Sequence, residues 1–343
     1  MVNIAIVGCG YWGPNLIRTF SKLDQCKVTM CCDLDQSRLR AAEKLAPGAL
    51  MTTSYEEVLS STNVDAIALA TPVRSHLALG KAALQRGKHL LVEKPLAVTP
   101  EQCQELIEEA SKAKVVLMVG HTFLYSSALV KVKELARPDF LGDVLHIHSQ
   151  RLNLGRVQTD INAFWSLAPH DVSIALHLLN EMPIEVSAQG TAVLNKGIED
   201  IVSAHLTFAS GASADIHVSW LDPEKVRKVT VVGSKKMIVY DDTSAEEKVK
   251  VHDKSASIIT SKTNPAQTEV ELRSGEVSIH KVDASEPLAN ECTHFIQCIK
   301  EGKKPISDGE NGLNVVRVLD AANRSLKNHG DPTLLNREVV KAL

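Results

Sequence analysis

The chain has 343 residues, which is long for one ordinary domain and comfortable for two. Hydrophobic residues make up 44% and charged residues 23%, an average globular composition that excludes a disordered or collagen-like chain. Thirty-eight basic and 41 acidic residues give a formal net charge of −3, so we expect neither nucleic acid nor an anionic membrane as a partner.

The seven cysteines are scattered among apolar neighbours and form no Cys-X-X-Cys pair. This pattern indicates reduced core thiols and a cytoplasmic protein. The first residues, MVNIAIVG, lack the basic region of a secretory signal, and no apolar run approaches the roughly eighteen residues of a membrane-spanning helix. No metal site is assigned from the residue pattern.

Apolar runs alternate with helical periodicity in the N-terminal part of the chain. Strands are expected at 3–7, 27–32, 65–70, 89–92 and 115–119, and helices at 12–23, 37–46, 76–87 and 100–113. Such alternation is typical of βαβ units around a parallel sheet. The sequence therefore predicts a Rossmann dinucleotide-binding domain over residues 1–122.

The pattern changes after this domain. Helices are expected at 127–135, 165–179 and 312–326, a strand at 144–151, and hairpins through residues 210–211 and 233–234. Residues 243–285 are the most polar and are expected to be rich in loops. Strands that alternate apolar and polar residues indicate a large, mostly antiparallel open sheet with one face on a core. The predicted fold class is α/β plus α+β.

We expect residues 123–343 to form this second domain, with roles in substrate binding and oligomerisation. The last helix is expected to pack on either domain. A half-exposed sheet is expected to leave an apolar face, which a second subunit would cover in a homodimer or homotetramer.

The segment VGCGYWG contains a candidate dinucleotide-binding loop. It places Gly8, Gly10 and Gly13 in GxGxxG spacing, directly after the first predicted strand and at the start of a helix. The first glycine permits a tight turn, the second lets the backbone approach a pyrophosphate, and the third lets helix and strand pack closely. Tyr11 and Trp12 belong to the same loop and are candidate cofactor contacts.

An acid follows the second predicted strand, as this type of loop requires. Asp33 lies twenty residues after Gly13 and would accept hydrogen bonds from the adenosine ribose. Asp33 and Asp35 would repel a 2′-phosphate, so NAD is favoured over NADP. Arg38 is the counter-argument, although we expect it to be solvated on a helix.

Two further strand ends carry candidate ligand contacts. Thr71 and Pro72 follow the third predicted strand, and His76 begins the next helix, where a capping or solvated histidine is an equal alternative. The fourth strand ends in Glu93 and Lys94. A lysine there can donate to a substrate hydroxyl, and the following proline is compatible with a cis turn.

The segments VGCGYWG, ATPVRSH and GKHLLVEKPLA occur in this order and spacing. Together they resemble the glucose–fructose oxidoreductase, inositol dehydrogenase and rhizopine-catabolism (Gfo/Idh/MocA) family of NAD(P)-dependent sugar dehydrogenases, over essentially the whole chain. The resemblance implies hydride transfer between a ring carbon of a sugar or cyclic polyol and the nicotinamide. It also implies that the lysine of the Glu-Lys-Pro motif, here Lys94, lies in the active site.

The family's second signature is an aspartate four residues before a histidine, which is the proton acceptor. In FWSLAPHDVSIALHLL the histidine maps onto His170, but Ser166 stands at the aspartate position. Asp171 would point about 100° away from His170 on a helix. Either another acid such as Asp160 orients His170, or Lys94 carries more of the proton transfer.

The stretch SQRLNLGRVQTDINAFWSLAPHD resembles the branch of the family that acts on nucleotide-activated sugars, notably UDP-N-acetylglucosamine 3-dehydrogenases and related glucuronate enzymes. This implies oxidation at C3 of a UDP-N-acetylhexosamine or its uronate. Arg151, Asn153 and Arg156 would contact the diphosphate, and Tyr125 would contact the sugar. Two alternatives remain: an inositol or free-sugar dehydrogenase, and a non-catalytic NAD-binding relative, which Ser166 keeps open.

Overall fold

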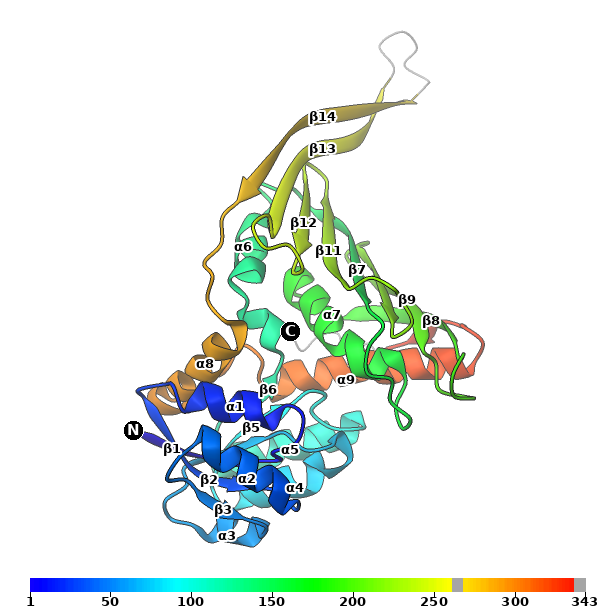
Figure 1. The fold of residues 1–343 in the computed structure, drawn as a ribbon. Coiled ribbons are helices and arrows are strands. Elements are labelled where there is room, and N and C mark those ends of the chain that lie inside the picture. The colour runs from blue at the N-terminus through cyan, green and yellow to red at the C-terminus, as the bar shows by residue number, and fades with distance from the viewer. Residues whose placement is uncertain (261–267, 336–343) are drawn as a thin grey trace. The chain divides into compact units, whose positions relative to one another are not determined.

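The structure is a computed structural model that describes residues 1–260 and 268–335 (Figure 1). It divides into two compact units: Met1–Tyr125 with Ser285–Arg317, and Ser126–Ala284 with Val318–Leu343. Within the described ranges, no helix is long and apolar enough to cross a membrane.

The first unit is built on a parallel sheet. Its strands are β1 (Val2–Val7), β2 (Cys26–Cys32), β3 (Leu50–Thr52), β4 (Ala66–Leu69), β5 (His89–Glu93) and β6 (Leu117–Gly120). Its helices include α1 (Gly13–Phe20), α2 (Gln36–Leu45), α3 (Tyr55–Ser60), α4 (His76–Gln85), α5 (Pro100–Ala113) and α8 (Pro287–Glu301). The strand order is β3-β2-β1-β4-β5-β6, the doubly wound order of dinucleotide-binding folds. The predicted fold of this part is confirmed.

The central strands are buried on both faces, which explains their continuous apolar sequences. Ile4 and Ile6 of β1 and Ile67 of β4 are fully buried, and each buried apolar Å² contributes about 25 cal/mol to folding. The sequence analysis did not predict β3 or α3. Both are short, with 3 and 6 residues, too few to produce a recognisable period.

The second unit contains a mostly antiparallel sheet. Its strands are β7 (Val144–Leu152), β8 (Pro183–Thr191), β9 (Ile201–Phe208), β10 (Ser213–Ser219), β11 (Val226–Gly233), β12 (Met237–Asp241), β13 (Val249–Thr260), β14 (Thr268–His280) and β15 (Thr333–Leu334). They lie in the order β14-β13-β12-β11-β7-β10-β9-β8-β15. β7 and β10 pair in parallel, and the other neighbours are antiparallel. The predicted mostly antiparallel sheet is confirmed.

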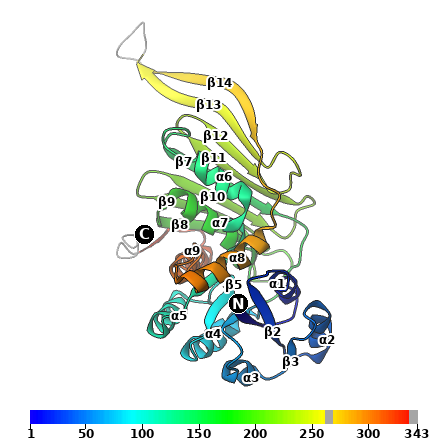
Figure 2. The same cartoon turned by 90° about the vertical axis from the view of Figure 1, so that its left-hand side faces the viewer.

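Helices cover one face of this sheet. α7 (Ala163–Leu179) packs on β7, β9 and β10, and α6 (Ser127–Leu135) packs on β12 and β13 (Figure 2). The side chains beneath α7 include Ile147, Ala204 and Ile216, which are buried. The second half of α9 (Gly309–Lys327) also belongs to this unit, where Ser325 Oγ accepts a hydrogen bond from the Ala188 N–H at 2.8 Å.

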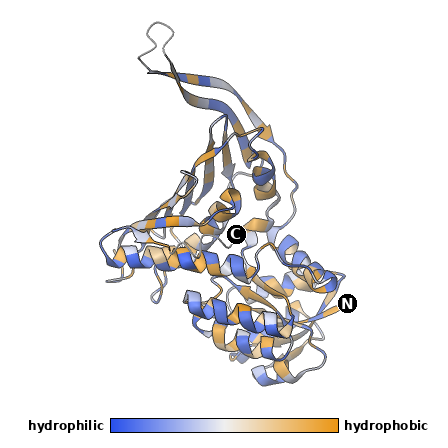
Figure 3. Cartoon of the chain, turned by 180° about the vertical axis from the view of Figure 1, so that it is seen from behind, coloured by the Kyte–Doolittle hydropathy of each residue, from blue (hydrophilic) through white to orange (hydrophobic). Residues whose placement is uncertain are grey.

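The opposite face of the sheet, which we call the open face, is polar. Hydrophobic and hydrophilic residues alternate along its strands (Figure 3). The open-face side chains are His146, His148 and Gln150 of β7, Ser213, Asp215 and His217 of β10, Ser203 and His205 of β9, and Ser187 and Gln189 of β8. The expectation of an apolar free face is therefore wrong for these strands, because most of their apolar positions point to the helices.

The prediction of loops over 243–285 is also wrong. β13 and β14 form a long hairpin, paired from Val249 with His280 to Thr260 with Thr268. β12 pairs with β13 only as far as His252. The rest of the hairpin, residues 254–260 and 268–274, is here called the arm. Lys254, residues 256–258 and residues 268–274 are exposed, so these stretches lack the alternation that burial on one face imposes.

Candidate active site

The loops at the carboxyl ends of the parallel strands bring several predicted site residues to one edge of the first unit. The glycine loop follows β1, Asp33 follows β2, Thr71 follows β4, Lys94 follows β5 and His121 follows β6. The strand order reverses between β1 and β4, and ligands of doubly wound sheets bind at this switch point.

The glycine loop is held by close backbone packing at two of its three glycines. Gly8 has φ +93°, and a Cβ there would lie 2.6 Å from the Ala70 carbonyl oxygen. A Cβ at Gly13 would lie 2.0 Å from the Gly8 carbonyl oxygen. At Gly10, by contrast, a Cβ would meet only the Arg38 guanidinium, at an ordinary 3.5 Å. The protein itself therefore does not require glycine at position 10.

The start of α1 is suited to an anion. No side chain caps its N-terminus, where Trp12 is the N-cap residue. Helix N-termini carry partial positive charge and unsatisfied N–H groups, which is how pyrophosphates are bound in such loops. The side chain of Tyr11 beside it is 79% exposed. The space at Gly10 and this helix end fit a dinucleotide pyrophosphate.

Asp33 supports the loop from the end of β2. Its carboxylate accepts hydrogen bonds from the N–H of Cys9 at 2.7 Å and of Asp35 at 2.8 Å. A carboxylate has about four lone-pair sites, so acceptor capacity remains for a ribose. Arg38 is 54% exposed, yet its guanidinium lies 3.7 Å from Asp33 and 3.6 Å from Asp35. It contacts both acids in addition to being solvated.

His76 connects two of the loops. It is 1% exposed, and its Nε2 lies 2.9 Å from the Thr71 carbonyl oxygen while Nδ1 lies 3.0 Å from that of Pro95. Burial lowers its pKa. Both ring nitrogens face protein carbonyls, so the geometry gives His76 a bracing role between the β4 and β5 loops. Thr71 and Pro72 form the turn directly after β4, and Thr71 Oγ1 accepts a hydrogen bond from the Ser75 hydroxyl.

Lys94 lies in a cluster of charged side chains. Its peptide bond to Pro95 is cis, and its N–H donates to Glu93 Oε2 at 3.3 Å. The Glu93 carboxyl lies against Gly120 of β6, where a Cβ would be 3.1 Å away. Glu291 of α8 is fully buried, and its Oε2 accepts a hydrogen bond from Thr122 Oγ1 at 2.9 Å.

Burial and mutual repulsion set the protonation of this cluster. Burial raises the pKa of Glu93, which Lys94 opposes, and burial together with the Glu93 charge raises the pKa of Glu291. Burial and the nearby Lys94 lower the pKa of His121 to about 3, so His121 is neutral. Burial thus favours the protonated form of both carboxyls, while Lys94 acts against this at Glu93.

Glu291 was missed in the sequence analysis, although a signal existed. It lies on the stripe of α8 that also carries Leu288, Cys292 and Phe295, all buried. An acid in the apolar stripe of a helix is seldom structural without a partner, because burying its charge is costly.

Tyr125, by contrast, was predicted to contact substrate. Its hydroxyl is buried 2.8 Å from Ser307 Oγ, so these contacts give it a packing role.

The second unit corrects the prediction for Arg151. This residue lies in β7, at the end of the strand predicted at 144–151, is 6% exposed, and pairs with Asp171 of α7. The Nε–Oδ2 distance is 2.6 Å and the Nη2–Oδ1 distance is 3.3 Å, and Ser149 donates to the same carboxylate. Arg151 therefore fixes α7 on the sheet and does not face a ligand. Asn153 and Arg156 lie on the loop after β7, where Arg156 is exposed.

His170 lies on α7, which begins after the N-cap Asn162. Because Asp171 is committed to Arg151, it does not orient His170. Ser166, one turn before His170, accepts a hydrogen bond from Gln158 Nε2 at 2.9 Å. Asp160, the alternative acid, is exposed on the loop before α7.

Comparison with known proteins identifies the family. Residues 2–121 match the model of the GFO/IDH/MocA oxidoreductase family with its NAD-binding Rossmann fold, and residues 129–239 match the model of the GFO/IDH/MocA C-terminal domain. The chain belongs to the Gfo/Idh/MocA family of oxidoreductases. The predicted family is confirmed.

Individual relatives in this family are distant. UDP-N-acetylglucosamine 3-dehydrogenase from Acidithiobacillus ferrooxidans is 24% identical over 94% of this chain and 95% of its own. Its solved structure superimposes with a TM-score of 0.81 over 96% and 98% of the two chains, at 20% identity. Inositol 2-dehydrogenase 2 from Saccharopolyspora erythraea is 28% identical over 54% of this chain and 56% of its own. An uncharacterized oxidoreductase of Streptococcus pneumoniae is 28% identical over a segment that covers 61% of this chain and 60% of the relative.

The difference between the glycines gives a first prediction. Gly10→Ala should fold like the wild type but bind NAD at least about tenfold more weakly, a loss of about 1.4 kcal/mol, because the methyl group would occupy the space left for the pyrophosphate. Gly13→Ala should instead destabilise the fold by about 2 kcal/mol or more, through the clash with the Gly8 carbonyl. Thermal melting and calorimetric titration with NAD measure the two effects. Unchanged NAD affinity in Gly10→Ala would contradict this account of the loop.

The buried Glu291 gives a second prediction. A carboxyl whose pKa is raised in the folded state stays protonated at pH values at which the same carboxyl is ionised in the unfolded chain. Its contribution to stability is complete below the unfolded pKa and declines as the pH rises towards the folded pKa, by up to about 1.4 kcal/mol per pH unit. Glu291→Gln keeps the acceptor for Thr122 and removes this decline.

We therefore expect the wild-type melting temperature to fall between pH 5 and pH 8, and Glu291→Gln to show a smaller fall. Glu43→Gln, at an exposed position of α2, is the matched control and should follow the wild type. Equal pH dependence in Glu291→Gln and the wild type would show that Glu291 is ionised in the folded protein.

Proposed function

We propose that the chain is an NAD-dependent sugar dehydrogenase that oxidises a ring hydroxyl, at C3 of a UDP-N-acetylhexosamine or its uronate, to a keto sugar. The observation that carries the proposal is the position of Lys94. It is the cation at the carboxyl end of β5, within the same unit as a glycine loop that fits a dinucleotide. In this proposal the first unit, Met1–Tyr125 with Ser285–Arg317, binds the cofactor, where the sequence predicted residues 1–122 alone, and the second unit serves substrate binding and assembly.

Lys94 and His170 divide the proton chemistry in this proposal. The Lys94 ammonium donates a hydrogen bond to the reacting hydroxyl oxygen and stabilises the carbonyl as it forms. His170 accepts the hydroxyl proton as general base. NAD, when bound, supplies the hydride acceptor. Burial favours the protonated form of the neighbouring Glu93, which weakens the Coulomb attraction between this carboxyl and Lys94.

NAD is proposed over NADP on the charges after β2. Arg38 forms ion pairs with Asp33 and Asp35, so two carboxylates and one guanidinium lie at this position and the local charge is negative. A 2′-phosphate would have to approach both acids and displace the contacts of Arg38.

Among the contacts predicted for the diphosphate, Asn153 and Arg156 remain proposals, because they lie on the loop after β7. The similarity to UDP-N-acetylglucosamine 3-dehydrogenase supports the sugar-nucleotide reading.

A cytoplasmic location and a homo-oligomer are part of the same proposal. All seven cysteines, which lie within the described residues, are buried free thiols, as expected in a reducing compartment. The arm exposes Ile258, Val270 and Leu272 on strands that no other described element covers. A second copy of the chain would bury these side chains.

The substrate is tested by mixing the chain with NAD and UDP-N-acetylglucosamine, its uronate, or myo-inositol, and following nicotinamide reduction with a carbonyl trap. We expect reduction with a UDP-sugar and a loss of about 10²–10⁴-fold in kcat/KM in Lys94→Ala. Lys112→Ala, at an exposed position of α5, is the control and should retain full activity.

Other outcomes of this panel separate the alternatives. Reduction with inositol alone would assign the chain to the polyol dehydrogenases, for which the inositol 2-dehydrogenase relative gives a precedent. No reduction with any substrate, together with intact NAD binding and no gain in Ser166→Asp, would favour a non-catalytic NAD-binding protein.

The arm is tested by the size of the protein in solution. We expect a dimer or tetramer at micromolar concentration by light scattering. Replacing residues 254–274 with a two-residue Asn-Gly turn should leave the rest of the sheet folded and lower the order of the assembly. A monomeric wild type would contradict the proposed oligomer, and an unchanged assembly in the variant would place the interface elsewhere.

A further inference from the structure

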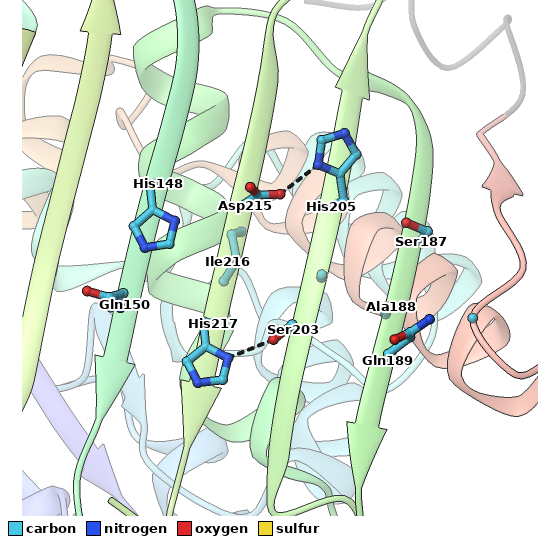
Figure 4. A pocket seen from close by; sticks show the side chains of 12 residues that line it. His148, Gln150, Ser187, Ala188, Gln189, Ser203, His205, Asp215, Ile216 and His217 are labelled. Atoms are coloured by element: carbon cyan, nitrogen blue, oxygen red, sulfur yellow. Dashed lines mark hydrogen bonds and ion pairs between the residues drawn. The ribbon is translucent and has the colours of Figure 1, made fainter.

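Histidine and aspartate side chains gather on the open face of the second unit. His148 of β7 lies opposite Asp215 of β10, and Asp215 lies opposite His205 of β9, in one row across three strands (Figure 4). His146 precedes His148 by two residues on β7, so both imidazoles project from the same face. The substrate chemistry proposed above does not use any of these residues.

The side chains are arranged like the ligands of a metal ion. One ligand atom each from His146, His148 and Asp215 can be chosen so that all three lie within 4.8 Å of one another. Asp215 Oδ2 is 3.5 Å from His146 Nε2. These three groups are therefore close enough for one ion between them to bind all three, after small rotations of side chains that are only partly buried.

Neighbouring groups already orient these side chains. Asp215 Oδ1 forms a 2.6 Å hydrogen bond with His205 Nδ1, which leaves Oδ2 on the side of His146. His146 Nδ1 lies 2.8 Å from Ser213 Oγ, which leaves Nε2 directed at the carboxylate. Partners of this kind fix ring orientation and tautomer in metal sites.

We propose that His146, His148 and Asp215 bind one divalent transition-metal ion of the zinc class, with His205 and Ser213 as supporting residues. Two imidazoles and one carboxylate suit Zn²⁺, Co²⁺ or Ni²⁺, whereas Mg²⁺ and Ca²⁺ prefer sites made of oxygen ligands. The ion cross-links β7 and β10, the parallel pair of this sheet. Its remaining coordination positions face away from the sheet and accept water.

The site is tested with the untagged full-length chain after removal of metals with a chelator. Co²⁺ is added, and its visible d–d absorption is followed to measure stoichiometry and Kd, with Zn²⁺ as competitor. We expect one Co²⁺ per chain, displaced by Zn²⁺ and unaffected by millimolar Mg²⁺. His148→Asn or Asp215→Asn should weaken binding by about 100-fold or more, and His205→Asn by about tenfold.

His217→Asn is the matched control. His217 lies on the open face, on the same strand as Asp215, and is hydrogen-bonded to Ser203 at 2.7 Å rather than to the proposed ligands. It should bind Co²⁺ like the wild type. Circular dichroism melting checks that each variant folds, so a folding defect is not counted as a lost ligand.

Three results would overturn the proposal: no Co²⁺ absorption in the wild type, unchanged affinity in both His148→Asn and Asp215→Asn, or an equal loss in His217→Asn. The first would leave the row as a set of hydrogen-bonded surface pairs. The last would indicate diffuse binding to surface histidines. Neither the metal readout nor its controls depends on the dehydrogenase activity.

Discussion

The cofactor site depends on one steric constraint, the contact between the backbone of Gly13 and the carbonyl of Gly8. With 2.0 Å between that oxygen and the place of a Cβ, only glycine lets α1 begin so close to the end of β1. This packing fixes where the uncapped N-terminus of α1 lies. It also leaves the backbone at Gly10 open, and Asp33 stabilises the loop through the Cys9 N–H. The dinucleotide site is therefore formed by the packing of the fold itself.

Electrostatics then gives this edge of the sheet its chemistry. Glu93, Lys94, His121 and Glu291 come from two strand ends and a helix far along the chain, and burial acts on the carboxyls and the imidazole together. Because burial penalises each charge, it favours the protonated carboxyls and the neutral imidazole. A lysine ammonium beside such groups is a good hydrogen-bond donor to an oxygen that gains negative charge. The proposed dehydrogenase chemistry rests on this property.

Sequence reasoning succeeded where one local signal was enough. The strands of the parallel sheet are continuous apolar runs, and the glycine loop and Lys94 follow such runs directly. It failed where the signal was weak or the partner was distant. β3 and α3 are too short to show a period, and the arm is exposed over residues 256–258 and 268–274. Arg151 was predicted to contact a diphosphate, but its ion pair with Asp171, twenty residues later, holds both side chains in the interior. The His146–His148–Asp215 group becomes recognisable only when segments far apart in sequence meet. Glu291 had a local signal, its place in the apolar stripe of a helix, but its neighbours Glu93 and Thr122 are far along the chain.

A crystal structure of the chain with NAD tests the central claim most directly. The account predicts the pyrophosphate over Gly10, within hydrogen-bond distance of the backbone N–H groups at the start of α1. It also predicts the adenosine ribose on Asp33 and the nicotinamide on the side of Lys94. A dinucleotide bound away from the carboxyl ends of β1 and β4, or a loop that rearranges so that Gly10 contacts no phosphate, would contradict it.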